Sequence, residues 1–194
     1  MSDIKFLVIG RTASGKTYLA HKAADKLGMK VVKSFTTRPP RPGEEENGDH
    51  YFIDSKENNI NKKDNIVAYT KINGYKYWTT KEELDRCDIY VIDPNGVKYL
   101  KEQCGDDYVF VEIYVDAPKK VRKRRYISRG GSWFGFFKRQ IKENAQFTNY
   151  AKNLKHDLLH WVVINGDNEN GLNHFMDIID CFTKMNNINY KIKE

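Results

Sequence analysis

The sequence has few cysteines and no long hydrophobic run. No apolar stretch approaches the roughly 20 residues that a membrane-spanning helix requires, and no basic leader with a cleavage site marks a secretory signal. We therefore expect no membrane partner. The three cysteines, Cys87, Cys104 and Cys181, are too far apart for a disulfide framework or for metal-ligand spacing. They favour free thiols in a reducing, cytoplasmic compartment.

Acidic residues are also in deficit. The 26 Asp and Glu residues face 33 Lys and Arg residues, which gives a formal net charge of +7. Such a charge suits either nucleic acid or small polyanions. Much of the excess lies in one run, made of Lys119, Lys120, Arg122, Lys123, Arg124, Arg125 and Arg129. Because this run fits a single helix, we favour a solvated lid helix over a nucleic-acid-binding surface.

Other functional patterns are missing or weak. No Ser–His–Asp or Cys–His combination indicates nucleophilic catalysis. His156 and His160 have the spacing of a metal-binding pair, but no further ligand clusters near them, so we expect a surface pair. Four aromatic residues could stack on bases, although a packed core or an interface is the preferred interpretation. They are Trp133, Phe134, Phe136 and Phe137.

One motif is complete. Residues 10–17 read G-R-T-A-S-G-K-T, which matches the phosphate-binding pattern G-x-x-x-x-G-K-[ST]. The glycines let backbone N–H groups converge on an anion, and the following helix adds its positive end. We expect Lys16 to reach the β and γ phosphates and the Thr17 hydroxyl to ligate Mg²⁺. A predicted strand at Ile4–Ile9 and a predicted helix at Tyr18–Leu27 favour this interpretation over a chance glycine-rich turn. The predicted ATP-binding loop comprises Gly10, Arg11, Thr12, Ala13, Ser14, Gly15, Lys16 and Thr17.

Apolar runs alternate with helical patterns along most of the chain. Further strand-like runs lie at Val31–Lys33, Ile89–Asp93, Tyr108–Val115 and Trp161–Asn165. Helical patterns cover Gly96–Gln103, Pro118–Ser128, Phe136–Lys155 and Gly171–Lys184. This alternation predicts an α/β fold with a P-loop NTPase-type parallel sheet flanked by helices, in a single domain of 194 residues.

Residues 34–86 interrupt the alternation. They hold clustered prolines and glycines, and Thr80 begins a capping box with Glu83 that predicts a helix start. Short strand-like pieces lie at Tyr51–Ile53, Ile66–Lys71 and Tyr75–Trp78. We interpret residues 34–86 as an inserted mixed α/β lobe that binds the acceptor nucleotide. A helical lid is expected at 125–145, with a hinge at Gly130–Gly135. The predicted core covers 1–33, 87–124 and 146–185, followed by a loose tail at 186–194.

Several motifs resemble the guanylate kinase family over nearly the whole chain. Ser34–Glu44 reads S-F-T-T-R-P-P-R-P-G-E, similar to the family's TTR-x-PR-x-GE run. Asp93–Gly96 resembles its D-x-Q-G step. The remaining matches are Arg125 with Arg129-Gly130 to the R-x-x-x-R-G lid motif, Lys138-Arg139 to the next lid arginine, and Val163-Ile164-Asn165 to the adenine-side I-x-N. The resemblance implies a kinase that transfers phosphate from ATP to a nucleoside monophosphate, with ATP and Mg²⁺ as cofactors.

The resemblance also implies roles for individual residues. The cations expected to act in catalysis are Lys16, Arg125, Arg129 and Arg139. The expected ligands of the acceptor phosphate are Arg38, Arg41, Tyr51 and Tyr77, with Glu44 orienting Arg41. The side chains expected near the two bases are Ser34 and Thr79 for the acceptor and Asn165 for adenine. Asp93 is expected near Lys16, where it would hold Mg²⁺-bound water, or alternatively to cap the next helix.

The sequence departs from the family pattern at the positions expected to contact the acceptor base. Counting back from Tyr77 places Ala68 where the family has a glutamate that accepts two hydrogen bonds from guanine, and Trp78 stands where glycine is usual. A hydrogen-bonding site discriminates strongly because its polar groups must be satisfied. We therefore expect relaxed or altered base choice, with Trp78 stacking on the base as one compensation. The nearby acidic substitutes are Glu45, Glu46 and Asp64.

The preferred hypothesis is phosphorylation of GMP or dGMP to the diphosphate. One alternative is the same transfer to another base. A second is a guanylate-kinase-like interaction module without catalysis, against which Lys16, Arg38 and Arg129 argue. A third is a nucleic-acid-binding ATPase, motivated by charge alone. The sequence leaves open a monomer or a homodimer.

Overall fold

The computed structural model describes residues 3–41, 44, 48–54, 65–153, 160–166 and 170–191. The first of its two sheets has the order β6-β1-β7-β8, and all of its strands are parallel. These strands are β1 (Asp3–Ile9), β6 (Ile89–Val91), β7 (Tyr108–Asp116) and β8 (His160–Ile164). The predicted parallel sheet is therefore confirmed. The short apolar run at Val31–Lys33 adds no strand to this sheet, because Val31 forms only an isolated bridge to Ile89.

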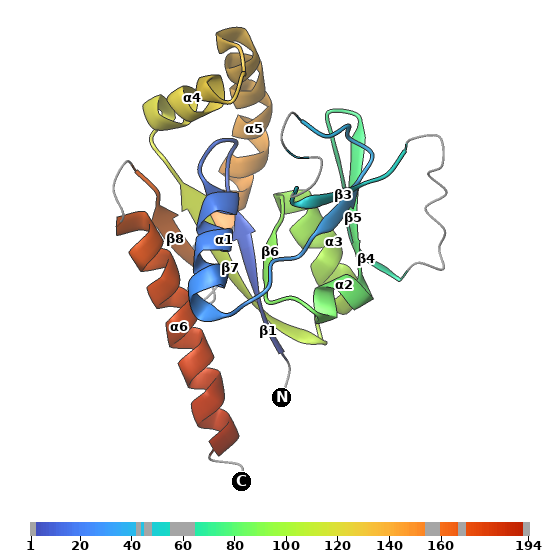
Figure 1. Ribbon diagram of the computed structural model, residues 1–194, viewed down its shortest axis with the longest axis vertical. Coiled ribbons are helices and arrows are strands. Elements are labelled where there is room, and N and C mark those ends of the chain that lie inside the picture. The colour runs from blue at the N-terminus through green and yellow to red at the C-terminus, as the bar shows by residue number, and fades with distance from the viewer. Residues whose placement is uncertain are drawn as a thin grey trace.

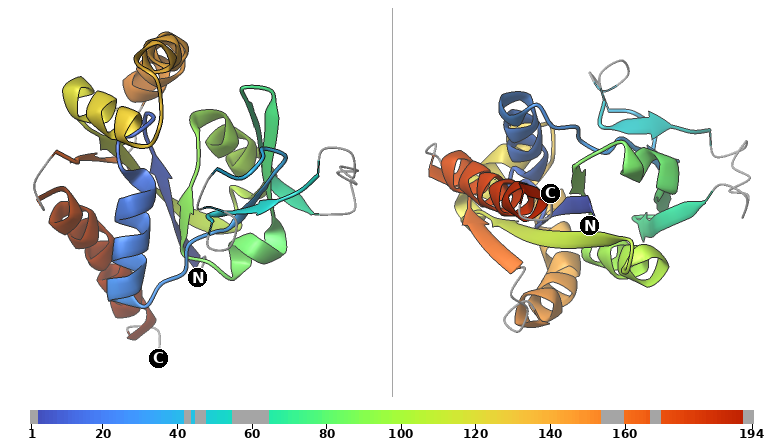
Figure 2. Two further views of the ribbon diagram at one scale, coloured as in Figure 1. Left: turned by 45° about the horizontal axis from the view of Figure 1, so that its top comes forward. Right: turned by 90° about the horizontal axis from the view of Figure 1, so that it is seen from below.

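Helices cover both faces of this sheet (Figures 1 and 2). On one face, α1 (Lys16–Leu27) and α6 (Asn170–Lys191) pack over Phe6 and Val8. On the other, α3 (Pro94–Cys104) and α5 (Trp133–Asn153) pack over Leu7 and Ile9. Successive residues of a strand point to opposite faces, so a sheet covered on both sides needs a nearly continuous apolar run. Helix α6 continues to Lys191, so the expectation of a loose tail is wrong for residues 186–191.

The second sheet has the order β3-β2-β5-β4. It is built from β2 (Ser34–Thr36), β3 (His50–Phe52), β4 (Ile66–Ile72) and β5 (Tyr75–Thr80). Strand β2 runs parallel to β3 and antiparallel to β5, and β4 and β5 form a hairpin. Asn73 and Gly74 turn this hairpin with φ angles of 51° and 89°, as a tight two-residue turn requires. The sheet is mixed, as expected for residues 34–86.

Helix α2 (Lys81–Asp85) begins where the capping pattern predicts. The Thr80 hydroxyl accepts a hydrogen bond from the Glu83 N–H at 3.3 Å. The carboxylate of Glu83 instead accepts from the Lys33 N–H and from Arg86. Only half of the capping box therefore forms, and Glu83 joins α2 to the segment that precedes β2.

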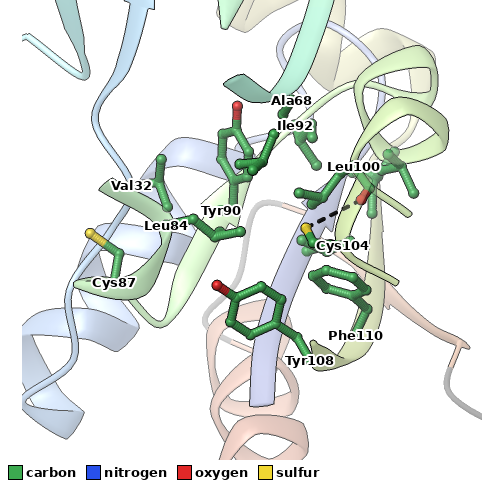
Figure 3. Close-up of a cluster of buried hydrophobic side chains, with 14 of the residues drawn as sticks. Val32, Ala68, Leu84, Cys87, Tyr90, Ile92, Leu100, Cys104, Tyr108 and Phe110 are labelled. Atoms are coloured by element: carbon green, nitrogen blue, oxygen red, sulfur yellow. Dashed lines mark hydrogen bonds between the residues drawn. The ribbon is translucent and has the colours of Figure 1, made fainter. Parts of the chain in front are cut away.

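A common apolar cluster joins the two sheets (Figure 3). It contains Ala68 of β4 and Leu84 of α2, together with Tyr90, Ile92 and Leu100 from the first sheet and α3. Ala68 is 1% exposed and Leu84 is fully buried. The second sheet is thus anchored on the core through β4 and α2, which fixes where its polar face lies.

Helix α4 (Lys119–Ser128) and the first half of α5 lie together at one end of the molecule, above the loop that precedes α1 (Figure 1). Arg122 is buried and joins them: its Nε donates to the Ala117 carbonyl and its Nη2 to Gln140, both at 3.0 Å. Helix α5 begins at Trp133, so the expected hinge is shorter than Gly130–Gly135. Within the described ranges, no helix has both the length and the apolar character needed to cross a membrane.

Candidate functional site

The loop at residues 10–17 joins β1 to α1 and needs its second glycine. Gly15 has a φ of 94°, and a Cβ atom there would lie 2.1 Å from Nδ2 of Asn165. That amide donates to the Ser14 carbonyl at 2.7 Å, and Asn165 is 5% exposed. Asn165, expected near adenine, thus also supports the loop from the end of β8.

The N-terminus of α1 forms one wall of the loop. Gly15 occupies the N-cap without a side-chain cap, and no acidic residue stands in the first turn. The N–H groups of a helix start carry partial positive charge and bind anions. Nζ of Lys16 donates to the carbonyls of Gly10 at 2.6 Å and Arg11 at 3.1 Å. The ammonium group therefore lies over the loop whose N–H groups it would assist.

Several charges surround Lys16. Burial lowers the pKa of its ammonium group to about 8. The carboxylates of Glu143 and Asp93 oppose this shift, whereas Arg139 and Arg129 reinforce it. Of the cations expected in catalysis, Arg129 and Arg139 are thus each within electrostatic reach of Lys16. A bound polyphosphate would stabilise the charged form of Lys16 and the two arginines together.

The fourth cation, Arg125, is placed differently. Its Nη1 donates to the carbonyls of Ser14 at 3.3 Å and Asn165 at 3.2 Å, and its Nη2 donates to Gly166 at 2.5 Å. The guanidinium group therefore joins α4 to the phosphate-binding loop and to the end of β8. Arg129 has different surroundings from Arg125, because α4 ends at Ser128 and Arg129 lies at its C-cap.

Glu143 was not anticipated from the sequence. Its carboxylate accepts hydrogen bonds from the Thr12 N–H at 3.1 and 3.2 Å and from the Thr12 hydroxyl at 2.5 Å. It also accepts from Nε of Arg139 at 3.3 Å and is 9% exposed. The Glu143 carboxylate is thus hydrogen-bonded to a backbone N–H group of a loop whose sequence motif is typical of phosphate binding. A signal was available, since Glu143 is the first acidic residue after Asp116 and follows Arg139 by one helical turn.

A second cationic group lies beside the second sheet. The carboxylate of Glu44 accepts from Nη2 of Arg38 at 2.8 Å, from the Arg41 N–H at 3.1 Å and from Nη1 of Arg41 at 3.3 Å. Burial alone would raise the pKa of Glu44, but the hydrogen bonds from Arg38 and Arg41 lower it overall. Glu44 therefore orients both arginines, where the resemblance implied only Arg41. Arg38 is 9% exposed and also lies over the ring of Phe52.

The two faces of the second sheet separate the predicted acceptor ligands. Thr36 pairs with Tyr77, and Phe35 with Trp78, so members of each pair share a face. Tyr51 pairs with Phe35 in the parallel ladder, and their ring centroids are 4.9 Å apart. Tyr51 therefore lies with Phe35 and Trp78, on the face opposite Tyr77. Trp78 is buried against Phe35, so the expected stacking of Trp78 on the acceptor base is a wrong prediction.

His50 shares the face of Tyr77. Its Nδ1 lies 2.9 Å from the hydroxyl of Ser34, and its ring centroid is 5.6 Å from that of Tyr77. His50 was not expected at the site from the sequence, because the family motif, aligned with a one-residue insertion before Gly48, matches only Tyr51. Strand alternation would have separated the two neighbours.

Polar groups other than a carboxylate surround Ala68. Ala68 pairs with Thr79, which is fully buried, across the β4–β5 ladder. Among the described residues, the buried hydroxyl of Thr79 makes no hydrogen bond. Burial first, then the charge of Asp93, raises the pKa of Tyr90. Figure 3 shows the hydroxyl end of Tyr90 directed toward the strand that carries Ala68. The substitute candidates Glu45, Glu46 and Asp64 lie outside the described residues.

Asp93 connects three elements near Lys16. Its carboxylate accepts from the N–H groups of Asn95 and Gly96 and so caps α3. It also accepts from Thr70 at 3.3 Å and from Gln146 at 3.0 Å. The capping alternative is therefore confirmed, and the electrostatic reach to Lys16 is present as well. Within the described residues, no three His, Cys, Asp or Glu side chains form a metal-binding group.

In both the basic run and the aromatic cluster, some side chains are buried and others are exposed. Arg122 and Phe136 are buried, and Lys123 lies over the ring of Trp133. Exposed aromatic side chains on the first turns of α5 are Trp133, Phe134 and Phe137. The predicted surface pair of His156 and His160 lies outside the residues whose side chains are described.

Comparisons with known proteins agree with this architecture. A sequence model of the family described as guanylate kinase matches residues 5–180. The guanylate kinase of Fusobacterium nucleatum is 25% identical over 182 residues, which cover 90% of this chain and 95% of that protein. The guanylate kinase of Chlamydia muridarum is 28% identical over 172 residues, covering 84% and 80%. A crystal structure of guanylate kinase from Anaplasma phagocytophilum has the same fold, with a TM-score of 0.64 at 21% identity over 93% of this chain and 86% of that one.

Proposed function

Because the chain belongs to the guanylate kinase family, we propose that it transfers the γ-phosphoryl group of ATP to a nucleoside monophosphate, with GMP or dGMP as the acceptor. The observation that carries this proposal is a complete phosphate-binding loop, with Nζ of Lys16 on its carbonyls and with Arg139 joined to it through Glu143 and Thr12. Phosphoryl transfer is catalysed mainly by positioning and by cations around the transferring group. A protein that only recognises a partner has no need of this arrangement.

The reaction needs no covalent intermediate. An oxygen of the acceptor phosphate attacks the γ-phosphorus, the bond from that phosphorus to the β–γ bridging oxygen breaks, and ADP leaves. We propose that Lys16 and the loop N–H groups hold the β and γ phosphates and that Arg129 and Arg139 neutralise the transferring group. Arg125 supports the loop through its carbonyls.

For the acceptor, we propose that Arg38 and Arg41 bind the monophosphate, each oriented by Glu44. Tyr77 and the hydroxyls of Ser34 and Thr79 belong to the same side of the second sheet. In this proposal residues 34–86 form the acceptor lobe and residues 125–145 the lid. Mg²⁺ would be held by the Thr17 hydroxyl and the ATP phosphates, with Asp93 acting through water, and would supply charge neutralisation at those phosphates. A kinase of this kind works where ATP is abundant, so a cytoplasmic location is part of the proposal.

A second candidate is the same reaction with relaxed base choice. It is favoured by the side chains at the base, where Ala68 presents a methyl group and Thr79 and Tyr90 present hydroxyls. Hydroxyls both donate and accept, so they satisfy several base edges. The glutamate carboxylate that the family has at the position of Ala68 only accepts hydrogen bonds.

A coupled ADP-release assay with every ribo- and deoxynucleoside monophosphate tests both candidates. We expect turnover that requires a mononucleotide, is not stimulated by DNA or RNA, and is lost in Lys16→Ala with an unchanged circular dichroism spectrum. ATP hydrolysis stimulated by nucleic acid would support the ATPase alternative. Absence of turnover with every acceptor, despite a folded protein, would support the interaction module.

A further inference from the structure

His50 occupies a defined place on the polar face of the second sheet. It lies on β3, the edge strand, and pairs with Ser34 in the parallel ladder. Its Nδ1 lies 2.9 Å from the Ser34 hydroxyl, and its ring meets that of Tyr77 edge-on at 5.6 Å. Its neighbour Tyr51 points to the opposite face, where its ring is tilted by 32° against that of Phe35 and lies under Nζ of Lys33. The register thus puts His50, and not Tyr51, beside Tyr77.

The charges that face His50 come from three segments. Arg38 follows β2, Glu44 lies in the loop after it, and Asp49 precedes His50 on the chain. Asp49 is itself paired with His21 of α1 at 2.5 Å. Among the described residues, no hydrogen bond is made to Nε2 of His50. Because Ser34 contacts Nδ1, the second ring nitrogen is available for a ligand on the side of Arg38.

We propose that His50 is a further ligand of the acceptor's phosphate group, together with Arg38 and Tyr77. This inference rests on the proposed function, because it identifies one more residue of the same acceptor site. The chemistry that His50 recognises is a phosphate monoester dianion. A neutral imidazole offers Nε2–H to a phosphate oxygen, and an imidazolium adds a charge to that bond.

The surroundings of His50 make its binding pH-dependent. Burial first, and then the nearby charge of Arg38, lowers the pKa of His50, while Asp49 and Glu44 partly oppose the shift. The imidazole is therefore neutral at pH 7 in the free protein. An incoming dianion adds negative charge and raises the pKa of the same ring. Binding then takes up a proton, so acceptor affinity should fall as pH rises through the neutral range.

Two substitutions at His50 distinguish the contributions of its two ring nitrogens, Nδ1 and Nε2. His50→Asn keeps a polar group near Ser34 and removes the one at Nε2, whereas His50→Gln keeps a donor near Nε2 that cannot titrate. GMP binding to the full chain is measured by calorimetry between about pH 6 and pH 8.5, with His174→Asn, at an exposed histidine of α6, as the matched control. We expect His50→Asn to weaken GMP binding about tenfold at neutral pH. His50→Gln should bind within about threefold of wild type, without its pH dependence beyond that of the phosphate. His174→Asn should bind GMP as wild type does.

The outcomes distinguish this inference from the function on which it rests. If wild type binds GMP and His50→Asn retains both the affinity and the pH profile, His50 is not a ligand and the proposed function stands. The same conclusion follows if His174→Asn loses as much affinity as His50→Asn. If wild type binds no nucleoside monophosphate, the acceptor site itself is overturned. Thermal unfolding of each variant reports whether a loss of binding reflects a loss of fold.

Discussion

The carboxylate of Glu143 accepts hydrogen bonds from both the backbone N–H and the hydroxyl of Thr12. Thr12 belongs to the phosphate-binding loop, and Glu143 lies on α5, one turn beyond Arg139. The same carboxylate is the largest favourable charge acting on Lys16. An internal anion thus lies among groups that a polyphosphate would contact, so we expect ATP and Glu143 to compete for Thr12.

Removing the charge of Glu143 should therefore strengthen ATP binding. A ligand binds with reduced apparent affinity when the binding-competent state of the protein is only partly populated. Glu143→Gln removes much of that cost, so the apparent affinity for ATP should rise about tenfold. The dissociation constant of ATP is measured by equilibrium titration without acceptor. Glu102→Gln, which changes an exposed carboxylate on α3, is the control and should leave ATP binding unchanged. Weaker ATP binding in Glu143→Gln would mean that the carboxylate assists the nucleotide.

The lowered pKa of Lys16 predicts how ATP affinity changes with pH. The ammonium group of the free protein is charged below about pH 8 and loses its proton above it. Bound phosphate favours the charged form, so the dissociation constant of ATP should rise once the pH exceeds about 8. Binding is measured from about pH 7 to pH 9.5 in wild type and in Lys16→Met. The variant should bind weakly with a flat profile in this range; parallel profiles would assign the titration to another group.

Arg125 and Arg129 should differ in what their removal costs. Arg125 donates to the carbonyls of Ser14, Asn165 and Gly166, and loss of such charge-assisted bonds costs about 2 kcal/mol of unfolding free energy. Arg125→Ala should thus lower both stability and kcat. Arg129→Ala should lower kcat alone, because Arg129 is exposed at the end of α4. Urea unfolding and turnover are measured together, with Lys120→Ala as the exposed control. Equal stability of the two variants would contradict the supporting role of Arg125.

Base choice should be weaker than a carboxylate would give. Ala68 accepts no hydrogen bond, and each lost bond to a charged acceptor is worth roughly 1.5–3 kcal/mol. We expect kcat/KM for GMP to exceed that for IMP, which lacks the 2-amino group, by less than about tenfold. The comparison uses the same coupled assay for both acceptors. A preference for GMP near 10⁴ would show that another group reads the 2-amino edge.

Introducing the carboxylate requires more than one substitution. Ala68 is 1% exposed and lies in the apolar cluster with Tyr90. Ala68→Glu alone should therefore destabilise the fold by burying a carboxylate. Ala68→Glu combined with Tyr90→Ala makes room and should raise the preference for GMP over IMP. Tyr90→Ala alone is the control for the space created.

The sequence alone determined the phosphate-binding loop, the parallel sheet and the family, because these depend on local order. The glycine spacing at 10–17, the apolar runs of β1 and β7, and the capping residues Thr80 and Asp93 act on neighbouring residues of the chain. The end of the last helix is also a local feature, but it was not predicted. The polar composition of residues 186–191 did not indicate that α6 continues to Lys191.

Tertiary structure decided which side chains meet. A one-residue difference in a strand reverses the face of a side chain, so only the pairing of β3 with β2 could separate His50 from Tyr51. Glu143 and Thr12 are 131 residues apart in the chain, and Arg125 reaches β8 only because α4 packs above the loop. Such contacts depend on how elements pack and not on their periodicity. The motifs therefore indicated where the candidate site lies, whereas the contacts of Glu143 and His50 followed from the packing of α5 and of the second sheet.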